Sequence, residues 1–280
     1  TPESLRELMA VREIVHASRF KSATLPASAS RHKAGISAFI SRLYWHCHFI
    51  QKLESEPELE FRNLHRGYDG MREDDWNPRH FEALRAGRAG WPRGDACVVM
   101  LRETGWINFR MRAMLVSVAA YPLWLHWRPV GLWLARQFLD YEPGIHWSQM
   151  QMQSGATGIN VPRIYNPIKQ ARDHDPHGHF VRRWPPALRR VPDSWLFEPW
   201  RMPADLQARH GLQPGDIAEP PLDLESATRA AKARLFALKA QPDIRAAKAA
   251  IVQKHGSRKR PPTPSRGKKA ASKNQMDLDF

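Results

Sequence analysis

The sequence predicts an all-α protein, and three observations support this fold class. Apolar residues recur at three- and four-residue intervals along several segments of the chain, as on the buried face of a helix. No segment alternates apolar and polar residues over the length that a half-buried strand requires. The 23 prolines and 16 glycines favour many short helices over long coiled coils.

The N-terminal part is predicted to hold two long helices. Residues 2–18 and residues 34–54 both space their apolar side chains for one buried face. Residues 20–33 between them contain Ser, Ala and Pro and are expected to form a loop. Two shorter helices are predicted next, at residues 78–86 and 93–103.

The middle of the chain is predicted to form an almost wholly apolar helix over residues 106–121, which Pro122 closes. A further helix is expected at residues 130–139. Residues 168–222 are interrupted by prolines, and we expect only short turns there.

Two arginines interrupt the apolar segment and indicate a binding site. Arg110 and Arg112 both have apolar neighbours three and four residues away. An arginine in such surroundings is rarely buried without a carboxylate or phosphate partner. The nearest downstream candidates are Asp140 and Glu142. A helix cation that faces two loop carboxylates among aromatic side chains predicts a pocket for a planar, polar ligand.

The C-terminal part differs in composition from the rest. Residues 225–254 are rich in Ala, Lys and Arg and are expected to form exposed basic helices. Residues 255–280 contain mainly Lys, Arg, Pro, Ser and Ala and are predicted to be a disordered basic tail, because they cannot bury enough apolar surface to fold.

The charge balance favours nucleic acid as a partner. The 43 Lys and Arg residues against 28 Asp and Glu give a formal charge of +15 and a pI near 10.3, which attracts polyanions. The 11 tryptophans, interleaved with arginines, suit stacking on bases or on a flavin ring.

Membrane, secreted and metal-binding classes are not favoured. No apolar run is long enough to span a bilayer, and no signal peptide opens the sequence. Cys47 and Cys97 are the only cysteines; they are expected to be separate buried thiols, which fits a cytoplasmic protein. The segment 45–48 (WHCH) is not expected to bind zinc, because consecutive helix side chains point 100° apart.

Three segments of the chain carry a specific resemblance. TGWINFRMRAM, LDYEPGIHW and RIYNPIKQARDHDPHGHFVRRWPPAL resemble the flavin-binding helical domain of the DNA photolyase and cryptochrome family, in the family's order and at matching spacings. The resemblance covers residues 5–202. It is closest to a branch of small bacterial photolyase-like proteins that carry RLYWHCHFIQKLE and repair cyclobutane dimers, with a preference for single-stranded DNA.

The resemblance implies a multi-helical FAD-binding domain over residues 1–224. Two parts of the family pattern are missing from the sequence: the N-terminal antenna domain and the Thr-Ser-x-Leu-Ser loop that holds the flavin phosphates. Residues 28–33 are not a convincing substitute for that loop. We therefore expect the chain to begin after the loop and to bind FAD weakly by itself.

The resemblance also implies which residues contact the flavin. Arg112 and Asp140 would be the ion pair beside the ring, and Glu142 stands where the family has an Asp near the pyrimidine edge. His146 would face flavin N5, where photolyases have Asn and plant cryptochromes Asp, so its pH-dependent charge leaves the preferred redox state open. A purely structural salt bridge is the alternative. The expected cofactor-binding residues are Trp106, Phe109, Arg112, Asp140, Glu142 and His146.

The lesion site is implied in the same way. Trp45 matches the tryptophan that stacks on a flipped-out dimer, and Met152 stands where a second tryptophan is usual. Arg42 replaces the usual Glu or Gln, and Arg110 and Arg163 match arginines that contact the DNA backbone. The expected catalytic residues are Trp45, Met152 and His146; the expected DNA-binding residues are Arg42, Trp45, Arg110 and Arg163.

The electron-transfer tryptophans of the family are only partly present. Trp127 matches the middle member of the series, and Trp76 lies within two positions of the outer one. Met150 occupies the innermost place, and methionine is a poor carrier of an electron hole. This route is expected to be broken or bypassed. Possible substitutes, which the sequence does not rank, are Trp106, Trp147, Trp91 and Tyr141.

The resemblance implies light-driven repair of pyrimidine dimers in DNA by electron transfer from reduced FAD, in a monomer. A cryptochrome-like FAD photoreceptor without repair activity is the first alternative. A non-catalytic remnant that binds nucleic acid through charge alone is the second. The terminal residues Gln275–Phe280 (QMDLDF) loosely resemble the peptide with which bacterial repair proteins dock on the sliding clamp, so the clamp is a further expected partner.

Overall fold

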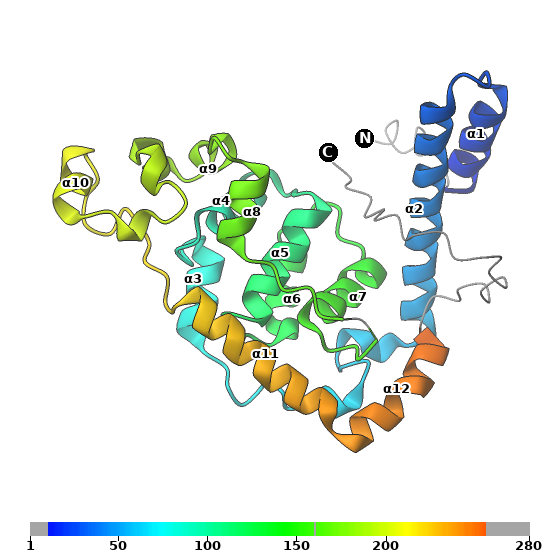
Figure 1. Ribbon diagram of the computed structural model, residues 1–280. Coiled ribbons are helices and arrows are strands. Elements are labelled where there is room, and N and C mark those ends of the chain that lie inside the picture. Colours follow the sequence, from blue (N-terminus) through cyan, green and yellow to red (C-terminus); the bar gives the residue numbers. More distant parts are fainter. Residues whose placement is uncertain (1–10, 160, 256–280) are drawn as a thin grey trace, which may run out of the picture.

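The computed structural model describes residues 11–159 and 161–255, and within these ranges it is helical without any strand. The predicted all-α class is therefore confirmed. Figure 1 shows a body of packed helices, a long helix that stands at one side of it, and a helix that runs along its lower edge.

The core is built around α5 (Phe109–Ala120), in which every residue from 113 to 120 is buried. Helices α4 (Pro92–Thr104), α6 (Trp127–Ala135) and α7 (Pro143–Ser154) pack against it. The predicted helix 106–121 was three residues too long at its start. The helix begins only after Asn108, which is its N-cap: the side-chain oxygen of Asn108 accepts a hydrogen bond from the backbone N–H of Met111.

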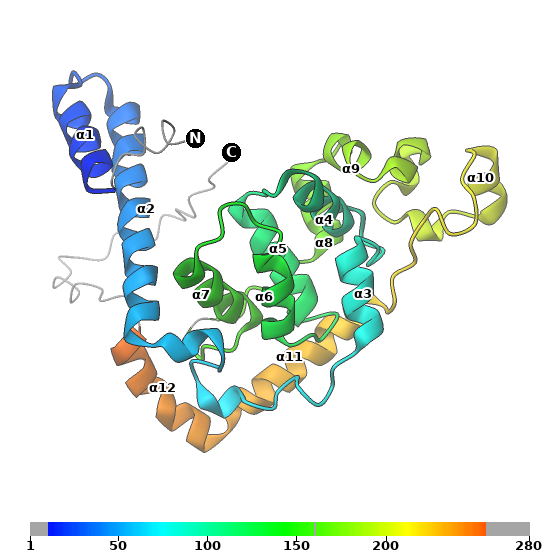
Figure 2. The same cartoon turned by 180° about the vertical axis from the view of Figure 1, so that it is seen from behind.

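The N-terminal helices form a hairpin that extends from the body (Figures 1 and 2). Helix α1 (Val11–Thr24) has no buried residue, and α2 (Ser30–Ser55) buries only Phe49 and Lys52. The predicted loop 20–33 was wrong in extent, because both helices continue into it and leave residues 25–29 as the connection. Residues 2–10 of the first predicted helix lie outside the described residues.

Short helices cover the far side of the core. The predicted helix 78–86 is present, and Asn77 caps its first turn. The stretch predicted to contain only turns also contains an eight-residue helix, α8, which Asn166 caps by accepting from two backbone amides. These elements are α3 (Pro78–Ala86), α8 (Pro167–His174), α9 (His179–Arg183), α10 (Ala204–Arg209) and the 3-10 turns Pro57–Glu60, Arg66–Tyr68, Pro186–Arg190, Asp193–Trp195 and Pro199–Arg201.

Two C-terminal helices, α11 (Leu224–Ala240) and α12 (Pro242–His255), close the lower edge. They match the predicted basic helices but are less exposed than expected, because Ala231, Leu235 and Ile244 are buried against Tyr68 and Tyr121. The predicted tail from residue 256 onward, including the Gln275–Phe280 segment, lies outside the described residues.

A fully buried arginine joins the C-terminal ends of α5 and α7. Arg72 donates to the carbonyl of Ala120 (2.9 Å) and to the carbonyl of Ser154 (3.0 Å), the last residues of α5 and α7. Helix C-termini carry carbonyls without intrahelical partners and the negative end of the dipole. Burial lowers the pKa of Arg72 to about 10, so it remains a cation at neutral pH.

Candidate functional site

A cavity of about 280 Å³ lies between α5, α6 and α7. This volume is close to the lower end of ligand pockets in proteins, about 300 Å³, so the cavity suits one ring system rather than a large ligand. Its wall is mostly apolar and aromatic, with one cation and two carboxylates. The lining residues are Trp106, Ile107, Phe109, Arg112, Ala113, Val116, Leu134, Phe138, Asp140, Tyr141, Glu142, Ile145, His146, Gln149, Met150 and Gln153.

Arg112 is fixed at this cavity by three groups. One terminal nitrogen of its guanidinium lies 2.9 Å and 2.8 Å from the two carboxylate oxygens of Asp140. Its Nε donates to the backbone carbonyl of Ile107 at 2.8 Å, and its Cζ lies 4.1 Å from the ring centroid of Phe138. Because the guanidinium is held on three sides, its direction does not depend on a bound ligand.

Glu142 belongs to the cavity wall but does not pair with Arg112. Its two carboxylate oxygens accept hydrogen bonds from the backbone N–H groups of Gly144 (3.0 Å) and Ile145 (2.7 Å), so it caps α7. An anion is stabilised at this place by the positive end of the helix dipole. Of the two acids expected to face Arg112, the structure brings only Asp140 into contact with it.

His146 lines the cavity as a neutral side chain. Its pKa is lowered to about 4, mainly by burial; the hydrogen bond to the Gly131 carbonyl raises the pKa, and the nearby Arg112 guanidinium lowers it. Its Nε2 lies 2.9 Å from the Gly131 carbonyl oxygen. A carbonyl only accepts, so Nε2 carries the hydrogen and Nδ1 is left as an acceptor. The pH-dependent charge expected for this residue is therefore absent near neutral pH.

Two tryptophans connect the cavity wall to the interior. The ring of Trp147 lies 4.8 Å from that of His146 and 5.9 Å from that of Trp127, both edge to face. Trp127 in turn donates to the side-chain oxygen of Asn63 at 2.7 Å. Gly131 makes room for this arrangement, because a Cβ built there would lie 2.6 Å from the Trp147 ring.

The other expected electron-transfer residue, Trp76, lies in a different aromatic group. Its ring contacts Phe81 at 5.0 Å, and Phe81 contacts Trp133 at 6.4 Å. No aromatic contact between Trp76 and Trp127 occurs in the part of the chain that the structure describes.

The expected lesion and DNA residues lie outside the lining of the cavity. Trp45 is 40% exposed on α2, where its ring packs 5.8 Å from that of the buried Phe49. Arg42, Arg110 and Arg163 are all exposed. Met152 is half-buried on α7. The structure thus brings the cofactor residues together as one group and leaves three cations available to solvent.

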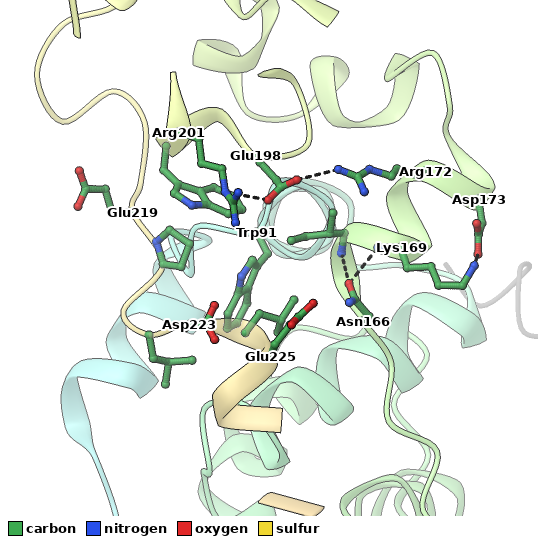
Figure 3. A pocket seen from close by; sticks show the side chains of 15 residues that line it. Trp91, Asn166, Lys169, Arg172, Asp173, Glu198, Arg201, Glu219, Asp223 and Glu225 are labelled. Carbon is green, nitrogen blue, oxygen red and sulfur yellow. Dashed lines mark hydrogen bonds and ion pairs between the residues drawn. The ribbon is translucent and has the colours of Figure 1, made fainter. Parts of the chain in front are cut away.

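A second cavity, of about 800 Å³, lies between α8, the segment 198–201 and the start of α11. Its cations are already neutralised. Glu198 accepts from Arg172 (2.7 Å) and Arg201 (3.0 Å), as Figure 3 shows, and Lys169 pairs with Asp173. Three further carboxylates line it: Glu219, Asp223 and Glu225. This negative excess does not suit the phosphates of a flavin nucleotide or of DNA.

Several residues of the cavity wall were not predicted to line it, although Tyr141 and Met150 had been considered for electron transfer. Phe138 and Tyr141 flank Asp140 and could have been found from that proximity alone, because aromatic residues beside a candidate acid are natural ring contacts. Gln149, Met150 and Gln153 required the recognition of α7 as a helix, on which residues three and four apart share a face.

Two negative findings apply to the described residues only. No cluster of three or more His, Cys, Asp or Glu side chains is arranged to hold a metal ion there. None of the helices in this part of the chain has the length and apolar character needed to cross a bilayer.

Comparison with known proteins identifies the family. Residues 39–237 match the model of the FAD binding domain of DNA photolyase, which is more than half of the chain. The chain belongs to the DNA photolyase and cryptochrome family. Its relatives include both kinds of protein. It is 34% identical to the cryptochrome DASH of Gloeobacter violaceus over 164 residues, and 32% identical to the deoxyribodipyrimidine photo-lyase of Vibrio cholerae over 181 residues.

A solved structure of this family shares the fold. The class III photolyase of Agrobacterium tumefaciens superimposes with a TM-score of 0.70 at 26% identity, over 83% of this chain and 48% of that one. The alignments with the Gloeobacter and Vibrio proteins include 57% and 61% of this chain, and 32% and 37% of those two proteins. The chain therefore spans between about a third and a half of the photolyases and cryptochromes that it matches.

The residues at the smaller cavity suit the flavin of this family. A ring-sized space with aromatic walls matches the isoalloxazine group, and a fixed guanidinium beside it complements negative charge on a reduced ring. Asp140 keeps that guanidinium oriented, and Glu142 and His146 offer acceptors at the same wall. This chain therefore has hydrogen-bond donors and acceptors at the cavity that suit a flavin ring.

Proposed function

We propose that the protein is a photolyase-like enzyme that repairs pyrimidine dimers in DNA with light, using FAD bound between α5, α6 and α7. The observation that carries this proposal is the cavity with the Arg112–Asp140 pair at its wall. FAD, when bound and reduced, supplies the electron that splits the dimer and then takes it back. The chain's own residues hold the ring and the lesion close together and limit the access of water.

Each site residue has a role in this proposal. Arg112 presents a positive charge to the reduced ring, and Asp140 holds it in place. His146, neutral and bonded to Gly131, offers an acceptor at the ring rather than a second cation. Glu142 fixes the start of α7 and therefore the position of His146.

DNA is the proposed substrate because of charge and exposed aromatic surface. The chain has a formal charge of +15, and Trp45 presents an exposed ring next to Arg42 on α2. Stacking of one base on an aromatic ring is worth about 1–3 kcal/mol, and a flipped-out or unpaired base is the cheapest to capture. Arg110 and Arg163 would contact the phosphates without reading sequence. A single-stranded or locally opened lesion site fits this arrangement.

The test is repair of a defined lesion by the purified chain. FAD-loaded protein with reduced flavin should restore an oligothymidine that contains one cyclobutane dimer under blue light, and should do nothing in darkness. Trp45→Ala should lose most of this activity while keeping its flavin. Protein that binds FAD but repairs neither single nor double strands would support the photoreceptor alternative. Protein that binds no flavin, with DNA binding that weakens steeply with salt, would support the non-catalytic remnant.

A further inference from the structure

We infer that Trp147 and Trp127 form the path by which electrons reach the flavin of this protein, in place of the series that Met150 interrupts. This inference rests on the proposed function, because it concerns how the flavin becomes reduced. Family members have a tryptophan where this chain has Met150. A thioether is harder to oxidise than an indole, so Met150 cannot take over that task.

Trp147 is the tryptophan that meets both geometric requirements of a first electron donor. Its ring lies 4.8 Å from His146, which lines the cavity, and 5.9 Å from Trp127. Electron transfer weakens steeply with the gap between rings, so consecutive ring contacts are the favoured route. Both indoles are only 1% exposed, which keeps water from reacting with the oxidised ring.

The other candidates lack one of these requirements. Trp106 lines the cavity but is 48% exposed, and no ring contact links it to another tryptophan in the described residues. Trp91 lies at the larger, acidic cavity. Tyr141 lines the cavity, contacts His146 at 5.2 Å and lies beside Trp147, but it is 39% exposed and makes no direct ring contact with Trp127 among the described residues.

The outer end of the path is close to solvent. The ring of Trp127 lies 5.4 Å from that of His126, whose side chain is 15% exposed and pairs with Glu73. The Trp127 N–H donates to the amide oxygen of Asn63, which is too weak a base to remove the proton. Oxidised Trp127 should therefore persist as a radical cation until an external donor refills it.

Each photochemical round moves one electron along the path. Trp147 gives one electron to light-excited oxidised flavin, and Trp127 gives one electron to Trp147. A thiol reductant in solution then restores Trp127. A second round, which starts from the flavin that has already received one electron, delivers the second electron. A dithiol that closes to its disulfide supplies both electrons together with two protons.

The test measures photoreduction rather than repair. FAD-loaded full-length chain is illuminated with blue light in dithiothreitol, and the loss of oxidised-flavin absorbance is followed together with the transient absorption of tryptophan radicals. Trp147→Phe and Trp127→Phe should each slow photoreduction at least tenfold and remove the long-lived radical cation. Trp133→Phe, which changes another half-buried tryptophan on α6, should stay within twofold of the wild type.

Two further measurements separate the possible failures. Adding Met150→Trp to Trp147→Phe should restore photoreduction, which shows that the loss concerned electron supply and not folding. With chemically reduced flavin, Trp147→Phe and Trp127→Phe should each repair dimers at the wild-type rate, because neither residue lines the cavity. Wild-type photoreduction in either Trp147→Phe or Trp127→Phe would overturn the assignment. Absence of repair in the wild type with chemically reduced flavin would instead overturn the proposed function and leave the electron path standing.

Discussion

At the scale of single residues, Arg112 allows a structural role to be separated from a binding role. Its side chain is 25% exposed and that of Asp140 is 49% exposed, so the pair contributes less than about 1 kcal/mol to folding. Arg112→Lys keeps the charge, but an ammonium cannot hold both the Asp140 carboxylate and the Ile107 carbonyl as the planar guanidinium does. We expect FAD affinity to fall about tenfold, or about 1.4 kcal/mol, while the urea midpoint hardly changes.

The matched control is Arg102→Lys, at an exposed arginine near the end of α4. It should leave both FAD titration and unfolding unchanged. If Arg112→Lys lowered stability by several kcal/mol and left FAD affinity intact, the pair would be purely structural, which is the alternative that the sequence left open.

His146 predicts a specific dependence of stability on pH. The unfolded side chain takes up a proton near pH 6.5, whereas burial lowers the pKa in the folded protein to about 4. Stability is therefore fully present above pH 6.5 and is lost as the pH falls toward 4. The loss amounts to about 3 kcal/mol at most. Since His146→Asn has no titrating ring, it should be less sensitive to acid in this range.

The measurement is urea unfolding at pH 7, 5.5 and 4.5 for the wild type, His146→Asn and His210→Asn, the last at an exposed histidine. The difference between wild type and His146→Asn isolates one titration from the others. Equal slopes for wild type and His146→Asn would show that folding does not lower the pKa of this ring.

The residue scale also shows what local sequence can predict. Arg112 and Asp140 were found because a cation in an apolar helix needs a partner. The role of Glu142 was different from that expected, although Glu-Pro-Gly is a recognisable helix start, with an acceptor before a proline at the first helical position. Gln151 could not have been found locally. It is fully buried and bonds to Leu59, Arg62 and Leu64, which lie 87 to 92 residues away in the sequence.

At the scale of elements, the site depends on a close crossing of α7 and α2. A Cβ at Gly144 would lie 2.7 Å from the backbone oxygen of Phe49, so α7 crosses α2 almost backbone to backbone. We expect Gly144→Ala to destabilise the protein by about 1–3 kcal/mol, because a rigid backbone atom must move. It should also weaken FAD binding, since α7 carries His146 and Glu142.

Gly94→Ala is the control, because Gly94 lies in α4 with no atom within 4 Å of the added methyl group. There the helix-favouring alanine should be neutral or stabilising by up to about 1 kcal/mol. Both variants are compared by urea unfolding and FAD titration. A Gly144→Ala protein as stable as Gly94→Ala would mean that α2 and α7 are not in tight contact.

The helices differ in how well the sequence predicts them. The central helix was predicted because its residues are almost wholly apolar apart from Arg110 and Arg112, and only its capping residue Asn108 moved the start. Helix α7 was missed because QMQMQS has no amphipathic pattern, yet Gln151, Gln153 and Ser154 are all buried. Its polar residues are satisfied by distant backbone groups, and such pairings are set by the tertiary fold.

At the scale of the whole molecule, Arg72 holds distant parts of the chain together. Besides the ends of α5 and α7, its guanidinium lies 4.5 Å from the ring of Trp124, which in turn lies 5.1 Å from Arg234 of α11. Asp75 accepts from both Trp124 and Arg234. Arg72→Met removes the donor to the carbonyls of Ala120 and Ser154, both of which are in buried residues, so we expect a loss of about 3 kcal/mol or more.

Arg234→Met serves as the comparison, because its side chain is 57% exposed and its ion pair is worth at most about 1 kcal/mol. Urea unfolding of the full chain measures both. If the two variants lost the same free energy of unfolding, the buried Arg72 would contribute no more to stability than the exposed Arg234–Asp75 pair does.

The whole-molecule properties divide in the same way. Composition predicted a polyanion partner, and the spacing of motifs predicted the family, which the match over residues 39–237 confirms. The choice between repair and light sensing depends on a few positions such as Trp45, Met150 and His146. Their effect comes from ring distances and protonation, which no local pattern encodes. The domain boundary at residue 224 stays a prediction, although α11 packs into the body.

The hairpin of α1 and α2 has a consequence for how the protein opens. Its outer turns bury no side chain, so their amide hydrogens should exchange with deuterium long before those of α5, and a protease should cut there first. Trp45 stands one turn from the anchoring Phe49. The ring that we propose to stack on a damaged base therefore lies at the border between the exposed part of the hairpin and the packed body, so we expect its surroundings to adjust to a bulky strand more easily than the walls of the cavity do.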